Sequence, residues 1–155
     1  MILDERNEFC DATALNTGVA GSYLLGDQID LGLQGGAVGN NVLAGGEDMY
    51  LVLTVDTTAT SGGAATGQFH LASDAAAAIA TDGSAIYHWS SGAIPVATLV
   101  AGYVIGIVRL PLAPDYERYL GIVQTTAVAA FTAGKVNAFL TRDPAKWVAT
   151  KDAVN

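Results

Sequence analysis

Hydrophobic and polar residues alternate along most of the chain with a period of two, which is the pattern of half-buried β-strands. In the segment DMYLVLTVD (48–56), the apolar residues Met49, Leu51, Leu53 and Val55 fall on one face. The same alternation recurs in further segments: YLLGDQIDLG (23–32), GQFHLAS (67–73), AIYHWSS (85–91), GYVIGIVRL (102–110), YLGIVQTT (119–126) and KVNAFLT (135–141). The pattern predicts about seven or eight short strands and no long helix.

Glycine, asparagine, aspartate, serine and proline separate these runs, as they do between antiparallel strands. The segments 32–48 and 57–67 are rich in glycine and small residues, and we expect long flexible loops there. The stretch 73–84 is the one helix-like segment, in which Asp74 could cap a single turn of alanines or an irregular loop. We therefore predict an all-β fold, an antiparallel jelly-roll-like β-sandwich with long Gly-rich loops and extended termini.

The length of 155 residues suits one domain, which we expect to span residues 1–155. The acidic start predicts an N-terminal arm over about residues 1–15. The segment beyond Thr141, with Pro144 and Trp147, predicts a C-terminal tail over about residues 143–155. The apolar runs are too short and too interrupted to span a bilayer, and the N-terminus lacks the pattern of a signal peptide. We expect a protein made in a cytoplasm and used without membrane insertion.

The net charge is −8, and it is distributed unevenly. Residues 1–108 contain 11 acidic residues and one basic residue, whereas residues 109–155 contain four acidic and six basic residues. An acidic chain without clustered Lys and Arg is not expected to bind nucleic acid. The single cysteine, Cys10, excludes an intramolecular disulfide and is expected to be a small buried residue.

The motifs of common hydrolases and phosphate-binding loops are missing from the sequence. His70, His88 and Asp74 could approach one another as a metal site, but zinc sites have tighter spacing and more ligands, so we expect half-buried or surface histidines. The aromatic residues Tyr87 and Trp89 are expected on one face of a strand, packed in the core or an interface, although a sugar-stacking platform stays open. We therefore predict no enzyme, no cofactor and no metal.

Several short motifs, taken in order, resemble the capsid cement proteins, or head decoration proteins, of tailed bacteriophages of the short-tailed type. The segments that carry this resemblance are MILDERNEFCDATAL (1–15), MYLVLTVDT (49–57), RLPLAPDYERYLGIV (109–123) and FTAGKVNAFL (131–140). The resemblance implies a β-jelly roll that binds the outer surface of the head as an oligomer. It implies the major capsid protein and other copies of this chain, in a homo-dimer or a homo-trimer, as partners that hold the shell against the pressure of packaged DNA.

A protein of this kind needs surfaces that bind neighbouring subunits and no catalytic cleft. The candidate interface residues are Asp4, Phe9, Asp11, Arg118, Tyr119 and Trp147. Arg118 and Tyr119 either pin the preceding turn, with Asp115 or Glu117 as the partner of Arg118, or anchor an interface, where Arg and Tyr are enriched. The alternative function is a phage-surface module that binds host glycans, with Trp89 or Tyr50 stacked on the sugar.

Overall fold

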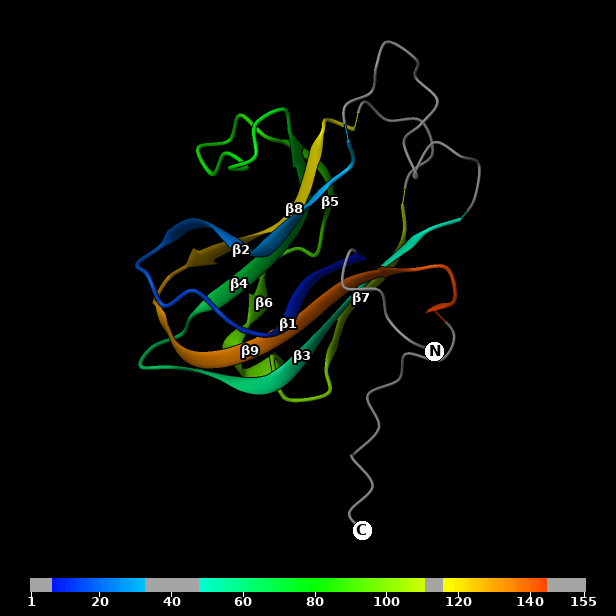
Figure 1. Ribbon diagram of the computed structural model, residues 1–155. Helices are drawn as coiled ribbons and strands as arrows, with labels where there is room; N and C mark the ends of the chain where they lie inside the picture. The colour runs from blue at the N-terminus through cyan, green and yellow to red at the C-terminus, as the bar shows by residue number, and fades with distance from the viewer. Residues whose placement is uncertain (1–6, 33–47, 111–115, 145–155) are drawn as a thin grey trace.

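Two antiparallel β-sheets pack face to face in the computed structural model, which describes residues 7–32, 48–110 and 116–144 (Figure 1). The first sheet contains, in order, β1 (Glu8–Ala14), β9 (Phe131–Thr141), β3 (Tyr50–Ser61) and β7 (Val104–Arg109). The second contains β2 (Gly21–Asp30), β8 (Tyr119–Ala127), β4 (Thr66–Asp74) and β5 (Ile86–Ser90), and the short β6 (Ile94–Pro95) pairs with β4. The predicted all-β antiparallel sandwich is confirmed.

The strand order is that of a jelly roll. The antiparallel pairs β1–β9, β2–β8, β3–β7 and β4–β5 are nested within one another, as in a long hairpin that has been folded over. The pairs β3–β9 and β4–β8 then join these ribbons into two sheets. Each short connection therefore lies at one of the two ends of the sandwich.

The core lies between the sheets and is built from alternate residues of the strands. Its largest fully buried side chains include Phe69, Phe131, Leu51 and Leu120. Burial of each such side chain contributes roughly 1.5–3 kcal/mol, so the sandwich needs no disulfide or metal. A smaller cluster covers the outer face of the second sheet, where Ile79 of the loop after β4 packs among residues that include Val123.

The expected N-terminal arm is wrong for residues 8–14, which form the edge strand β1. Alternation fails there because β1 contains two register shifts, between Glu8 and Cys10 and between Cys10 and Thr13. Phe9 and Cys10 are consequently both buried, and Ala12 adopts a positive φ of 44°. A strand with two bulges does not produce a period of two, so the pattern could not be recognised.

The expected long loop at 57–67 is also wrong, because β3 continues to Ser61 and β4 starts at Thr66. The threonines read as flexible are β-branched strand formers, and Thr57 and Thr60 pair with β9. Most of the expected loop at 32–48, and the tail from residue 145 onwards, lie outside the described residues.

The segment after β4 is an irregular loop, as expected for the alanine-rich stretch. The Asp74 carboxylate accepts hydrogen bonds from the backbone N–H groups of Ala76 (2.9 Å) and Ala80 (2.9 Å). These bonds favour the ionised form and lower the pKa of Asp74. Within the described part of the chain, no helix has the length and hydrophobicity to cross a membrane.

Candidate functional site

Arg118 joins the end of β2 to the start of β8. Its Nε donates to Asp30 Oδ1 at 2.9 Å and its Nη2 donates to Asp30 Oδ2 at 2.8 Å. The guanidinium carbon lies 4.9 Å from the centroid of the Tyr119 ring. The hydrogen bonds from Arg118 lower the pKa of Asp30 to about 2. Arg118 therefore links the end of β2 to the start of β8, whereas most of the turn that it was predicted to pin, residues 111–115, lies outside the described residues.

The expected partner of Arg118 was wrong, because the carboxylate that it binds is that of Asp30 and not a neighbour in the preceding turn. Asp30 pairs with Tyr119 across the β2–β8 ladder, so Arg118 binds a carboxylate that is 88 positions away in sequence. Asp115 lies outside the described residues, and Glu117 instead donates its backbone N–H to Ser73 Oγ at 3.1 Å. A cross-strand partner is invisible to a reading of local sequence.

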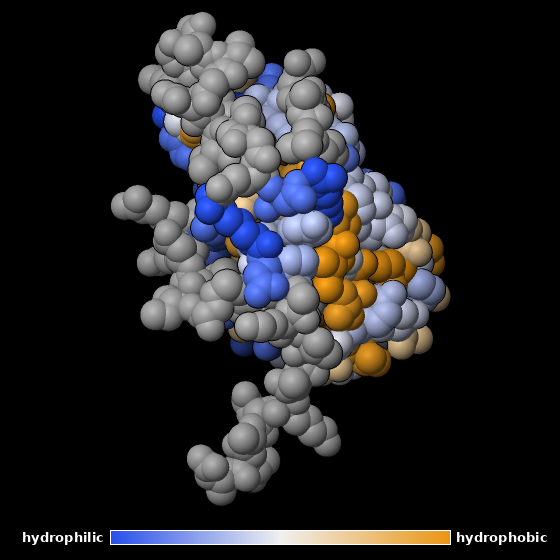
Figure 2. Space-filling view, turned by 90° about the vertical axis from the view of Figure 1, so that its right-hand side faces the viewer, coloured by the Kyte–Doolittle hydropathy of each residue, from blue (hydrophilic) through white to orange (hydrophobic). Residues whose placement is uncertain are grey.

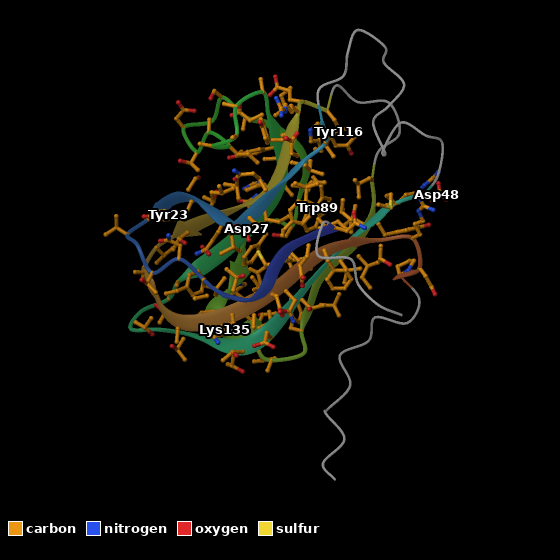
Figure 3. All side chains as sticks on the ribbon, in the orientation of Figure 1. Tyr23, Asp27, Asp48, Trp89, Tyr116 and Lys135 are labelled. Atoms are coloured by element: carbon orange, nitrogen blue, oxygen red, sulfur yellow. The ribbon has the colours of Figure 1, made fainter. Side chains whose placement is uncertain are left out.

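A second ion pair lies at the same end of the sandwich, between Arg109 at the end of β7 and Asp48 just before β3. Figure 3 shows Asp48 at this end, with Tyr116 on the same side of the molecule. We call this end, where β2, β4, β7 and β9 finish, the charged end. Both ion pairs of the described residues lie there, and each holds two strands of one sheet together.

Ser73, His88 and Tyr116 form a polar and aromatic cluster at the charged end. The buried Ser73 Oγ accepts the Glu117 N–H, so its own hydrogen can be donated to His88 Nε2, which lies 2.7 Å away. The ring of Tyr116 packs on that of His88 with centroids 4.1 Å apart. Burial lowers the pKa of His88 and raises the pKa of Tyr116 to about 12. The cluster holds the segment before β8 onto the second sheet in an uncharged form.

His70 and His88 lie on opposite faces of the second sheet. His70 stacks on Tyr87 on the outer face, with ring centroids 4.4 Å apart, whereas His88 reaches Ser73 on the inner face. His88 is half-buried, as expected, and His70 is more deeply buried, which lowers its pKa. Among the described residues no group of three or more His, Cys, Asp or Glu is arranged to hold a metal ion.

Tyr87 and Trp89 do not share a face, contrary to expectation. A register shift between Leu71 and Ala72 leaves His88 as an extra residue, so the side-chain direction changes within β5. Trp89 points between the sheets (Figure 3), and a Cβ atom at Gly106 would lie 2.8 Å from its ring. Tyr87 points outward and is 40% exposed. The indole is partly buried and packs against the core.

The six candidate interface residues do not form one patch in the described structure. Phe9 is 2% exposed in the core, so its side chain is not available for a surface contact and that expectation is corrected. Asp11 is exposed on the edge strand β1, and Arg118 and Tyr119 lie together at the charged end. Asp4 and Trp147 lie outside the described residues.

The opposite end of the sandwich carries no charged residue on its connections. It is formed by the turns 15–20, 62–65 and 128–130 with the adjoining segment 91–103, which contain no Asp, Glu, Lys or Arg. We call it the neutral end, and its three turns lie at the left of Figure 1. Val19 and Val128, at 77% and 75%, are the most exposed large hydrophobic residues described. They lie on neighbouring turns, because Gly21 pairs with Thr126.

The turns of the neutral end are fixed by side-chain hydrogen bonds. The fully buried Gln124 accepts the Asn16 N–H at 2.9 Å and donates to the Asn16 carbonyl at 3.1 Å. The Tyr23 hydroxyl donates to the Val19 carbonyl at 2.7 Å, and Ser61 Oγ donates to the Ala130 carbonyl at 2.7 Å. The neutral end is therefore built rigidly although its surface is uncharged.

Val128 has a strained backbone, with φ at 70°. The Ala129 N–H donates to the Ala127 carbonyl at 2.9 Å, so Val128 is the central residue of a three-residue γ-turn with positive φ, which is the rare and strained form. For a β-branched residue this conformation costs of order 1–3 kcal/mol, whereas Gly or Asn adopts it readily. The chain keeps a valine where stability alone favours another residue.

The edge strands β5 and β7 carry one charged residue between them, Arg109, which ends β7 at the charged end. The rest of both strands lies in the segment 83–108, which contains no Asp, Glu, Lys or Arg. Its exposed hydrophobic side chains include Ile86, Tyr87 and Ile107. Figure 2 shows hydrophobic residues gathered in a strip beside the hydrophilic residues of the charged end. Charge is one of the devices that protect edge strands of soluble proteins, and these two strands carry none apart from Arg109.

Sequence reasoning missed both uncharged surfaces. The signal was present in long charge-free segments of the sequence, which include 12–26, 57–73, 83–108 and 119–134. Only the jelly-roll topology shows that the turns inside these segments meet at one end and that β5 and β7 are neighbouring edges. Counting charges along the chain does not reveal where they gather in space.

Comparison with known proteins gives one family. No curated protein matches the chain. The family model named Bbp16, a name of the phage type, matches residues 9–140, which includes all of the chain except its two ends. The match covers every strand described here apart from the first residue of β1 and the last residue of β9. The chain therefore belongs to the Bbp16 family.

Proposed function

We propose that this chain is a structural virion protein, a capsid cement protein that binds the outer surface of a bacteriophage head and acts without catalysis. The observation that carries the proposal is the combination of a rigid jelly roll with exposed, uncharged surfaces at one end and along one side. Membership of a family with a phage-type name supports it. The jelly roll is also a recurrent architecture of viral capsid proteins.

The proposed partner is the major capsid protein. A protein that binds the intact shell more tightly than the ruptured shell shifts the equilibrium toward the intact shell. The gain is about 2.7 kcal/mol per site when the free protein is at 100 times its Kd. Many sites act together on one head, so a modest affinity suffices. A preorganised surface of small residues serves this role because its side chains lose little entropy on binding.

Homo-oligomerisation, as a dimer or a trimer, is the second part of the proposal. We place the contact at the β5–β7 side, where two copies that each carry a net charge of −8 can meet without placing like charges together. Its exposed apolar side chains and uncharged strand edges suit such a contact. Replacing Ile107 by Lys should shift the mass in solution to that of the monomer.

The function is tested by mixing the full-length protein with undecorated, expanded heads and measuring co-sedimentation and mass in solution. Saturable binding at a fixed ratio to capsid subunits is expected, together with heads that resist heat or chelators better. Absence of binding to mature heads would contradict the cement role. A glycan array run in parallel tests the alternative function, which the inward position of Trp89 does not favour.

A further inference from the structure

We propose that the neutral end is the face that docks on the shell protein, with Val19 and Val128 inserted into an uncharged hollow of the shell surface. This inference rests on the proposed cement function and specifies which part of the molecule makes the contact. The partner is a protein other than this chain, and the contact is apolar.

The first argument is the distribution of charge. The chain carries 15 acidic residues, yet the turns 15–20, 62–65 and 128–130 and the segment 91–103 have none. Exposed turns usually carry charged or strongly polar residues, which are well hydrated. A surface without charge is cheaper to desolvate, and charged residues are depleted at the centres of protein interfaces. The composition of this end favours burial against another protein.

The second argument is the strain at Val128. A positive φ and a hydrogen bond between Ala129 and Ala127 hold the isopropyl group outward at the tip of the β8–β9 turn. Strained residues persist where the surroundings impose them, and they cluster at functional sites. Val19 projects from the neighbouring turn, which the Tyr23 hydroxyl fixes through the Val19 carbonyl. Two immobilised apolar side chains on adjacent turns are suited to enter a preformed hollow.

The third argument concerns the partner. Both valines project, so the same end of a second copy would present protrusions to protrusions. The turns 15–20, 62–65 and 128–130 of the neutral end contain no strand, unlike the β5–β7 side, which we assign to contacts between copies. The complementary surface must therefore supply a hollow, and it must be uncharged. The proposed function gives this chain two partners, other copies of itself and the shell protein. Because copies meet at the β5–β7 side, the neutral end is left for the shell protein.

The experiment measures co-sedimentation of full-length variants with undecorated heads. Val19→Asp and Val128→Asp each place a charge in the contact, and Asp tolerates a positive φ, so the second variant should fold. Ala77→Asp, in the exposed loop at the charged end, is the matched control. We expect each valine variant to weaken head binding about tenfold or more and the control to bind like the wild type. Circular dichroism and mass in solution should not change for any of the three.

The outcomes separate this inference from the function on which it rests. If the wild type fails to bind heads, the cement proposal fails. If the wild type and all three variants bind equally, the cement proposal stands and the neutral end is not the docking face. If Val128→Asp does not fold, Val128→Asn and Val19→Asp decide the question, because Asn also adopts a positive φ. Weaker binding by Ala77→Asp alone would place the contact at the charged end.

Discussion

The two ends of the sandwich are formed by the same eight long strands, yet their polar side chains have different partners and different exposure. At the charged end, ionised side chains bind one another within the chain, as Arg118 binds Asp30 and Arg109 binds Asp48. At the neutral end, polar side chains such as Gln124 hold the backbone from inside, and the exposed surface carries valine, alanine and glycine. The ion pairs of the charged end lie within the chain, whereas the neutral end leaves apolar side chains exposed.

The two sides of the sandwich show the same contrast. The edge strands β1 and β2 carry the acids Glu8, Asp11 and Asp27 and contain register shifts. At their closest approach Gly26 has a φ of 70°, and a Cβ atom there would lie 2.0 Å from the Phe9 carbonyl oxygen. Charge and bulges are the devices that prevent edge-to-edge association. The edges β5 and β7 retain register shifts but carry no charge apart from Arg109 at the end of β7, which is why we place contacts between copies there.

Loss of the hydrogen bonds between Gln124 and the Asn16 backbone, at the neutral end, should have the largest effect on stability. Gln124→Leu removes the partners of the Asn16 N–H and carbonyl groups and should lower the free energy of unfolding by about 2–4 kcal/mol, because each buried unsatisfied polar group costs about 1–3 kcal/mol. Urea denaturation measures the change. At a temperature where the variant is folded, it should also bind heads more weakly than the wild type. Unchanged stability would show that the Gln124 hydrogen bonds do not stabilise the neutral end.

Loss of the polar cluster at the charged end should have the second-largest effect on stability. Ser73→Ala leaves the Glu117 N–H and His88 Nε2 without this partner and should destabilise the fold by about 1–3 kcal/mol. Head binding by the folded variant should not change. Ser84→Ala, at an exposed serine, is the control and should change stability by less than about 0.5 kcal/mol.

The two histidines of the second sheet, His70 and His88, predict that stability depends on pH. Burial lowers the pKa values of His70 and His88, so the unfolded state binds protons more readily than the folded state. Stability should be complete above the unfolded value of 6.5 and should fall as the pH decreases through the lower folded values. His70→Phe should weaken this dependence in a urea series between pH 7 and 5, and an equal dependence in the variant would contradict the contribution of His70.

Relief of the backbone strain at Val128 should raise stability. Val128→Asn places a residue that tolerates a positive φ at the tip of the β8–β9 turn and should raise the free energy of unfolding by about 1 kcal/mol. Thermal denaturation measures the gain. Because the substitution removes the projecting apolar group, head binding should weaken while stability rises. A variant that is both more stable and equally tight in binding would show that the valine is not kept for contact.

The exposed ion pair should have the smallest effect. Arg118→Ala should lower stability slightly, and the difference from the wild type should be complete above pH 3.8 and disappear as the pH falls through about 2, where Asp30 protonates. Denaturant titrations at three pH values measure this difference. We expect oligomer mass and head binding to stay intact. Their loss would restore the interface role considered for Arg118 and Tyr119 from the sequence.

Period-two alternation was sufficient to find seven of the eight long strands and the sandwich class. It failed at β1, because two register shifts bury the consecutive residues Phe9 and Cys10. It failed in β5, because the extra residue His88 reverses the direction of the side chains around it. It also cannot identify cross-strand partners, so the ion pair between Arg118 and Asp30 required the topology.

The candidate site was harder to predict from the sequence than the fold. Arg118 and Tyr119 were chosen because their residue types are common at interfaces, and the structure shows that both interact within the chain. The turns that we assign to docking consist of small residues with no distinctive motif. Their significance comes from the absence of charge at one place in space and from the backbone conformation of Val128, and neither can be read from single residues.

Hydrogen–deuterium exchange of the full-length protein, free and bound to heads, tests the central claim most directly. The account predicts that the amides of turns 15–20, 62–65 and 128–130 exchange more slowly on the head. The loop 75–85 at the charged end should exchange at the same rate in both states. Protection of that loop, with unchanged exchange at the three turns, would contradict docking through the neutral end.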